Sequence, residues 1–344
     1  MISRSRFHGS RWTVPVLILI TLLALPTWGT RGGSSASASS AKAAMTKVRI
    51  AFSTWTGYGP LVVAVQRGFF KKHGLDVSYH VVESPSDREA AIKANQLDGA
   101  ASTVDTFTRW AAQGAPIQMV LGIDFSAGGD GIVAKKSITT VRQLKGKTVA
   151  VAPGTVSEFF FDYVLQKNGM TINDVQLKDM PDSSISGSTF AAGKVDAAVT
   201  WEPWLTRAAH TGFGHILVSS AKYPTIIVDA LVLRTDFIKA HRSAVQNFVR
   251  AYYEAVNYTK TKTADAYKVI GAYVKETPPQ VAGDLQKVPL FGLAKSKSFF
   301  GTPSNPGPIY TTARKAGNFW LRLKKINKMP NLNQLINSTF LQQM

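Results

Sequence analysis

The chain has 344 residues, 45% of them hydrophobic and 18% charged, which excludes an intrinsically disordered protein and suits one or two domains. Lys and Arg number 40 against 21 Asp and Glu, a net charge of +19. The cations are scattered singly and in pairs, so this charge does not predict a nucleic-acid-binding surface. Because the chain has no cysteine, disulfides, cysteine-ligated metals and thiolate nucleophiles are excluded.

Residues 1–44 have the layout of a secretory signal. Three arginines precede an uncharged apolar stretch at 14–25, which is shorter than the roughly 20 residues that span a membrane. A tract of small residues follows, and its A-x-A patterns predict cleavage after Ala38 or after Ala43/Ala44. The alternative is an uncleaved anchor that leaves the rest outside the inner membrane. Either way we expect an exported, periplasmic protein, whose remaining residues carry a charge of +14.

From residue 47 onward, apolar strand patterns alternate with helical patterns. The predicted strands lie at 47–54, 75–83, 98–103, 117–123 and 130–135, and the predicted helices at 60–74, 86–95 and 104–113. The first strand, helix and strand form a βαβ unit. A βαβ unit predicts a parallel sheet with the helix packed on one face.

A second unit with the same order follows, and then a helical tail. Its strands are predicted at 147–152, 175–179 and 196–201, and its helices at 158–169 and 184–193. A further strand within 223–237 precedes helices at 236–260, 262–275, 278–286 and 310–325. We therefore predict an α/β protein with two lobes: residues 47–134 plus 229–344 in lobe 1 and 135–228 in lobe 2. The tail must pack on the lobes, because helices alone cannot form a third sheet.

Asp98 and Asp196 occupy equivalent places in the two units, each between a helix end and a strand of small residues. We interpret both as stabilising the turn into the strand rather than as ligand contacts.

Ligands of open parallel sheets bind at the carboxyl ends of strands and at the helix N-termini that follow. The side chains that these ends present are Ser53, Thr54, Trp55, Tyr58, Ser102, Thr103, Asp105, Asp124, Ser126, Asp130, Thr155, Ser157, Glu158, Thr200, Trp201, Glu202 and Asp229. The tryptophans offer flat apolar walls to a small ligand, although core packing explains them equally well. Helix capping is the alternative for Thr103, Asp105, Thr155 and Ser157, and a capping box is the alternative for Glu158.

Catalytic motifs are missing from the sequence. It contains no HExxH, GxSxG, Walker or GxGxxG pattern, and no histidine after the signal lies at a predicted strand end beside an acid and a serine. The sequence therefore predicts binding of a small molecule without turnover, and no cofactor or metal.

Four segments resemble the nitrate/taurine/aliphatic-sulfonate class of periplasmic solute-binding proteins of ABC importers, which also includes thiamine-pyrimidine binders. They are 54–60, 68–77, the hinge-like 144–150 and 196–204. The resemblance implies a type II periplasmic-binding-protein fold, with two lobes joined by a two-stranded hinge. It implies a monomer that closes on one solute and delivers it to an inner-membrane permease and its ATPase. It places ligand-binding residues in 53–58, at Ser102, Thr103 and Asp124–Ser126, in 154–157 and at Trp201 and Glu202.

The charges of the candidate residues bear on the ligand. The set contains Asp124, Asp130, Glu158, Glu202 and Asp229 but no Arg or Lys. Unpaired carboxylates in a closed cleft repel an anion by several kcal/mol, so an amine, a guanidinium-like cation or a zwitterion against tryptophan fits better. Taurine, an alkanesulfonate or nitrate is the alternative. A sensor or an enzyme on the same fold is a further alternative, although the desulfinases that resemble these binders need a cysteine.

Overall fold

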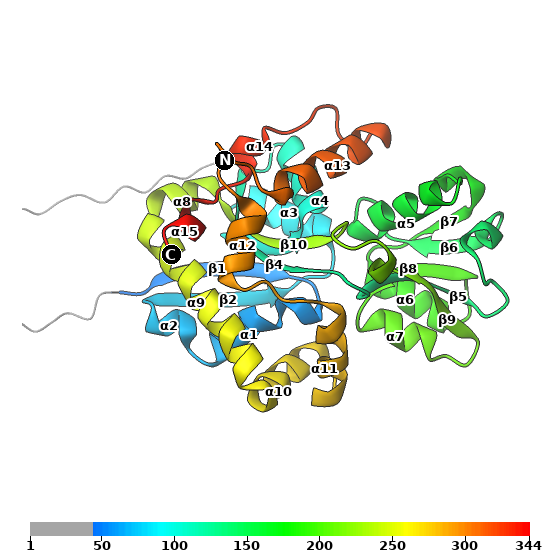
Figure 1. Cartoon of the computed structure of the whole chain (residues 1–344), viewed down its shortest axis with the longest axis horizontal. Helices are drawn as coiled ribbons and strands as arrows, with labels where there is room; N and C mark the ends of the chain where they lie inside the picture. The colour runs from blue at the N-terminus through cyan, green and yellow to red at the C-terminus, as the bar shows by residue number, and fades with distance from the viewer. Residues whose placement is uncertain (1–43) are drawn as a thin grey trace, which may run out of the picture. The chain divides into compact units, whose positions relative to one another are not determined.

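The computed structural model describes residues 44–344, so all but the last residue of the predicted signal lies outside it. The described chain folds into two five-stranded sheets, with helices on both faces of each (Figure 1). The first sheet contains, in spatial order, β2 (Leu75–Val81), β1 (Thr46–Phe52), β3 (Gly99–Thr103), β10 (Val228–Arg234) and β4 (Ile117–Phe125). The second contains β7 (Gln176–Asp179), β6 (Thr148–Val151), β8 (Ala197–Trp201), β5 (Asp130–Lys135) and β9 (Gly214–Ser219).

The two sheets have the same topology. In each, the first three strands are parallel and the fourth, β10 or β5, is antiparallel to both neighbours. Parallel neighbours require a crossover helix, and the structure provides one after each of β1, β2, β6 and β7. The predicted parallel βαβ arrangement is therefore confirmed in both units.

The helices that follow the strands are short, and the tail is helical as predicted. The helices before β10 are α1 (Gly59–Gln66), α2 (Phe69–Lys72), α3 (Pro85–Lys93), α4 (Val104–Ala112), α5 (Val156–Lys167), α6 (Ser183–Ala191) and α7 (Trp204–Ala209). The tail contains α8 (Thr235–Ala240), α9 (Arg242–Thr261), α10 (Thr263–Val274), α11 (Pro278–Lys287), α12 (Leu293–Phe300), α13 (Pro308–Arg322), α14 (Leu332–Leu335) and α15 (Thr339–Gln342). No helix in the described part of the chain is both long and apolar enough to cross a membrane.

Two predicted helices are interrupted. The helix predicted at 60–74 breaks at Gly68, whose φ of 72° is left-handed and ends α1. The helix predicted at 236–260 breaks at His241, whose φ of −130° and ψ of 42° are not helical and separate α8 from α9. The sequence analysis did not predict β9, α7, α12, α14 or α15.

The chain passes between the two sheets twice, at 126–129 and at 220–227. The predicted boundary after residue 134 is corrected, because β5 pairs with β8 and β9 and so belongs to the second sheet. The hinge-like segment at 144–150 is corrected as well. It forms a turn and most of β6 inside the second sheet, and it takes part in neither crossing.

Asp98 and Asp196 stabilise strand starts, as predicted. The Asp98 carboxylate accepts a hydrogen bond from the backbone N of Arg49 at 2.8 Å and pairs with its guanidinium. Asp196 accepts from the backbone N and the hydroxyl of Thr148 at 3.0 and 2.7 Å. A hydrogen bond from Lys135 holds the pKa of Asp196 down at about 2. Both carboxylates thus tie a strand start to the neighbouring strand, at the edge of the sheet opposite the predicted site residues.

Candidate functional site

Predicted strand-end residues from both sheets meet around one small cavity, here called the cleft cavity. Its lining includes seven of the predicted site residues, which are Trp55, Tyr58, Ser102, Thr103, Thr155, Trp201 and Asp229. Ser53 and Asp130, also at strand ends, line it as well. The cavity has a volume of about 20 Å³, which is room for about one water molecule. A larger solute therefore enters only if the two sheets move apart.

Strand register explains why these side chains meet. On the first sheet, Asp229 of β10 lies directly opposite Thr103 of β3 on one side and Asp124 of β4 on the other. On the second sheet, Asp130 of β5 lies opposite Trp201 of β8. Since β10 and β5 each begin where the chain has just crossed between the sheets, each crossing delivers an aspartate to the cavity.

Asp124 and Asp229 form a coupled carboxyl pair at the base of the cleft cavity. Burial raises the pKa of Asp229 to about 7, and burial together with the Asp229 charge raises the pKa of Asp124 well above its ordinary value. Trp55 donates its indole N–H to Asp124 at 3.2 Å, and Tyr58 donates its hydroxyl to Asp229. Because the two carboxyls lie opposite each other on β4 and β10, ionisation of one opposes ionisation of the other.

Gly57 is required for this arrangement. A Cβ at this position would lie 2.0 Å from Asp124 Oδ2 and 2.5 Å from the Trp55 indole nitrogen. Because neither group can move without breaking the hydrogen bond between them, any larger residue would disrupt the base of the cavity.

Arg88 corrects the expectation that the site holds no cation. It extends from α3, is only 2% exposed and lines the cleft cavity. One guanidinium nitrogen donates to the carbonyl of Val82, and Nε has no hydrogen-bond partner among the described residues. The guanidinium also interacts electrostatically with Asp229. The cavity therefore contains buried groups of both charge signs.

Sequence reasoning missed Arg88 because it considered only strand ends and helix starts. The available signal was helical spacing: the buried residues of α3 are Pro85, Arg88, Glu89 and Ile92, so the arginine shares the buried face with two apolar residues. The other lining residues that were missed are Pro85, Thr106 and Val156.

Six of the predicted ligand-binding residues lie outside the lining of the cleft cavity. They are Asp124, which lies behind Asp229, and Thr54, Ser126, Ser157, Glu158 and Glu202. Asp105 and Thr200, also predicted at strand ends, lie outside it too.

The two serines are buried and bonded to other serines. Ser126 is hydrogen-bonded to Ser220 at 2.7 Å, so this pair joins the two chain crossings. Ser157 is hydrogen-bonded to Ser183 of α6 at 2.8 Å. Neither serine lines the cavity.

Glu158 and Glu202 accept hydrogen bonds near helix starts. Glu158 accepts from the backbone N of Gly154 at 2.7 Å, so its helix-start role is the one observed. Glu202 is fully buried and accepts from the backbone N and the hydroxyl of Thr206. It also pairs with Lys287 of α11 at 2.5 Å.

Thr54 takes part in a contact between the half of the molecule built on the first sheet and the half built on the second sheet. Its hydroxyl donates to Glu83, while its carbonyl accepts the indole N–H of Trp201 at 3.1 Å. Two ion pairs also join the parts of the chain built on the two sheets. Lys287 of α11 pairs with Glu202, and Arg322 of α13 pairs with Asp162 of α5. The structure is thus closed over the cavity.

The sequence pattern of the NMT1-like family matches residues 41–273, more than half of the chain. The chain belongs to the NMT1-like family. It is 25% identical over 278 residues to a Brucella abortus protein whose name gives it a provisional binding role, covering 78% of this chain and 86% of that protein. It is 26% identical over 302 residues to a Bacillus subtilis protein provisionally named for binding aliphatic sulfonates, covering 83% and 84%.

The fold is also that of solved binding proteins. The alkanesulfonate-binding protein SsuA of Xanthomonas axonopodis pv. citri, bound to MOPS, superposes with a TM-score of 0.72 at 16% identity, covering 86% of this chain and all of that one. The predicted periplasmic-binding-protein fold is therefore confirmed, as is the predicted resemblance to the nitrate/taurine/aliphatic-sulfonate class.

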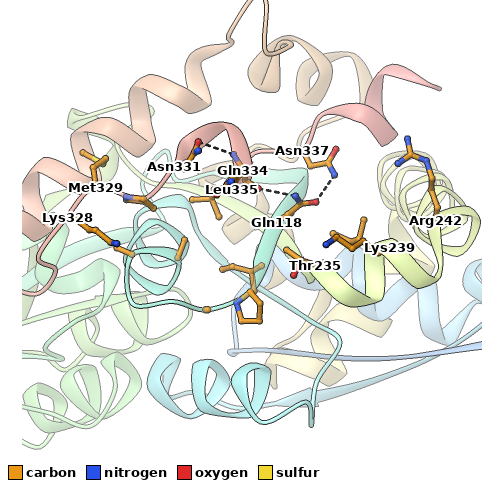
Figure 2. Close-up of a pocket in the computed structure, with 17 residues that line it drawn as sticks. Gln118, Thr235, Lys239, Arg242, Lys328, Met329, Asn331, Gln334, Leu335 and Asn337 are labelled. Carbon is orange, nitrogen blue, oxygen red and sulfur yellow. Dashed lines mark hydrogen bonds between the residues drawn. The ribbon is translucent and has the colours of Figure 1, made fainter.

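A larger pocket of this NMT1-like chain lies elsewhere. It has a volume of about 950 Å³ and adjoins Gln118 at the start of β4, about 20 Å along the strand from Asp124. Figure 2 shows Gln118 and Asn337 hydrogen-bonded to each other inside it, with Lys239 and Arg242 on one wall. None of the predicted site residues lines this pocket, so we place the candidate site at the cleft cavity.

The buried carboxyls predict an unusual pH dependence for this family member. Burial raises the pKa of Asp105 to about 6 and that of Asp229 to about 7, whereas an aspartate in the unfolded chain titrates near 4. Between about pH 4 and 7 the folded protein therefore binds more protons than the unfolded chain. The free energy of unfolding should fall as pH rises through this window, by about 1.4 kcal/mol per pH unit for each extra proton.

Urea unfolding of the solute-free protein at several pH values in this window measures the slope. Asp229→Asn should make the slope shallower, because the asparagine takes up no proton. The exposed Asp179 offers a matched control, and Asp179→Asn should leave the slope unchanged. Stability that rises with pH across the window would contradict this assignment.

Proposed function

We propose that the protein is the solute-binding component of an ABC importer, and that it captures one small zwitterion in the cleft cavity without chemical change. The observation that carries this proposal is that Arg88 and two aspartates, Asp130 and Asp229, line the same buried cavity. The family and the likeness to solved binding proteins support the general role.

The charges favour a zwitterion over a simple cation or anion. A solute with an acidic group and an ammonium group pairs with Arg88 and with the aspartates at once. A cation alone would leave Arg88 buried without a counter-charge, and an unpaired buried charge costs several kcal/mol. The indole rings of Trp55 and Trp201 line the same cavity and provide an aromatic surface for the methylene groups and the ammonium group of the solute.

We propose further that the two sheets are the cores of two lobes that hinge about the crossings at 126–129 and 220–227. The cleft cavity is too small for any solute beyond water, so capture requires opening, entry and reclosure. In this proposal residues 1–44 direct export to the periplasm, and the protein works as a monomer. The closed form then delivers the solute to a membrane permease and its ATPase, and no cofactor is needed.

A sulfonate anion is the second candidate solute. It is favoured by the raised pKa values of Asp124 and Asp130, because protonated carboxyls carry no charge to repel it. Arg88 would then face the anion, with Asp229 as the one lining carboxyl that still ionises near neutral pH. The Bacillus subtilis relative named for aliphatic sulfonates agrees with this candidate.

Differential scanning fluorimetry separates the candidates. The panel contains zwitterions (taurine and β-alanine), cations (guanidinium and propylammonium) and anions (ethanesulfonate and nitrate). The proposal predicts that a zwitterion raises the melting temperature most. Stabilisation by the anions alone would establish the second candidate, and stabilisation by the cations alone would contradict the role of Arg88.

A further inference from the structure

A groove of about 800 Å³ adjoins the second chain crossing, at 220–227. We call it the crossing groove. It is lined by Phe125 and Val228, the immediate neighbours of Asp124 and Asp229. Because successive side chains of a strand point to opposite faces, these two residues face away from the aspartates. The crossing groove is therefore a separate space from the cleft cavity.

Aromatic rings line the crossing groove on both sides of the crossing. Tyr163 of α5 and Tyr223 of the crossing segment lie edge to face with ring centroids 5.3 Å apart. Phe291, which precedes α12, and Phe299 of α12 form a second such pair with ring centroids 5.4 Å apart, and the Phe125 ring lies 6.0 Å from that of Phe291. A flat apolar molecule would find ring surfaces on either wall.

Three lysines surround these rings: Lys222, Lys295 and Lys315. No carboxylate lines the groove, and within residues 44–344 none of the three lysines forms an ion pair. The Lys295 ammonium lies 6.0 Å from the centroid of the Phe291 ring, so cation and ring face the same space. Unpaired cations beside aromatic walls are complementary to an anion with a flat apolar body.

We propose that the crossing groove is a second ligand site, which takes a flat aromatic anion such as an aromatic carboxylate. One wall includes Tyr163 of α5, a helix that packs on the second sheet. The other includes Phe299 of α12, a helix that packs on the first sheet. A bound anion therefore bridges parts that move relative to each other when the lobes hinge, and should alter solute affinity at the cleft cavity. This last consequence rests on the proposed function, whereas binding at the groove does not.

Thr225 supports a functional role for the crossing. It lines the crossing groove and has a φ of 67°, a left-handed conformation that is rare and costly for a β-branched residue. The strained backbone is thus located where a bound anion would touch the crossing segment.

Titration with 2-naphthoate, followed by its own fluorescence, tests the site on the full exported chain. Lys295→Glu and Lys315→Glu should each weaken binding at least about tenfold. Each helix offers a matched control with the same change of charge outside the groove: Lys297→Glu on α12 and Arg314→Glu on α13. The controls should change the affinity less than about twofold. Equal weakening by all four variants would show general attraction to a basic surface and overturn the proposal.

A further variant locates the probe. Arg88→Gln, in the cleft cavity, should leave 2-naphthoate binding unchanged. If Arg88→Gln abolishes it while the groove variants do not, the probe occupies the cleft and the proposal is wrong. Failure of every zwitterion to bind would refute the proposed solute without altering these expectations, so the two failures are distinguishable.

Discussion

Replacing Arg88 with glutamine is expected to weaken binding of the zwitterion by about 100-fold. The guanidinium is 2% exposed and is the only cation that lines the cleft cavity in the described part of the chain. Removing one member of a buried charge pair costs about 2–5 kcal/mol, because its partner is left without a counter-charge. Isothermal titration calorimetry with taurine, or with whichever zwitterion stabilises the protein most, measures the loss.

The same helix provides the control for this variant. Lys93 of α3 is exposed and pairs with Glu89, so Lys93→Gln should keep the affinity within about threefold. The Arg88 variant should also lose less affinity for propylammonium than for taurine, a change of selectivity that a general folding defect would not cause. Unchanged taurine affinity in Arg88→Gln would remove this residue from the site.

Lys287→Met is expected to weaken solute binding about tenfold and to speed release. Lys287 pairs at 2.5 Å with Glu202, which is fully buried and belongs to the second sheet's half of the molecule. Without the ammonium, closure leaves a buried carboxylate unpaired, so the closed form loses stability relative to an open one. Lys287 is itself 35% exposed, so solvent screening limits the effect to about 1–2 kcal/mol.

Stopped-flow measurement of the dissociation rate tests this effect directly. Lys287→Arg keeps the charge and should restore most of the affinity. Lys268→Met, at an exposed position on α10, removes the same charge without a cross-cleft partner and should bind as the unmodified protein does. Equal dissociation rates in Lys287→Met and the unmodified protein would show that this pair does not hold the closed form.

The order of strands and helices in the first two units could be predicted because most strands are apolar or alternating runs and a helical pattern separates each parallel pair. The elements that were missed are short or poorly buried. β9 has only one fully buried residue out of six, so its pattern lacks the alternation that marks a strand. The boundary at residue 134 was wrong because pairing of β5 with β8 and β9 joins segments far apart in sequence.

The candidate site was predictable where strand ends determine it. Thr103 and Trp201 are the last residues of strands with parallel neighbours, and parallel topology brings such ends to one edge of a sheet. Asp229 lies instead at the start of the antiparallel β10, which begins at that same edge. The strand-end rule fails for Ser157 and Glu158, which lie inside the first turn of α5. Glu158 accepts a hydrogen bond from the backbone N of Gly154 there, and Ser157 is hydrogen-bonded to Ser183 of α6. Arg88 reaches the cavity from the buried face of α3, which helical spacing indicates but the strand-end rule does not consider.

Hinged closure over the cleft cavity is tested most directly by the distance between two spin labels, one on each half. The chain has no cysteine, so Gln96→Cys and Lys178→Cys, both at exposed positions, give two unique labelling sites. Pulsed electron spin resonance on the solute-free protein should show a population at longer distance than the closed structure. A saturating zwitterion should abolish that population. Identical distance distributions with and without the solute, when calorimetry confirms that it is bound, would contradict the account.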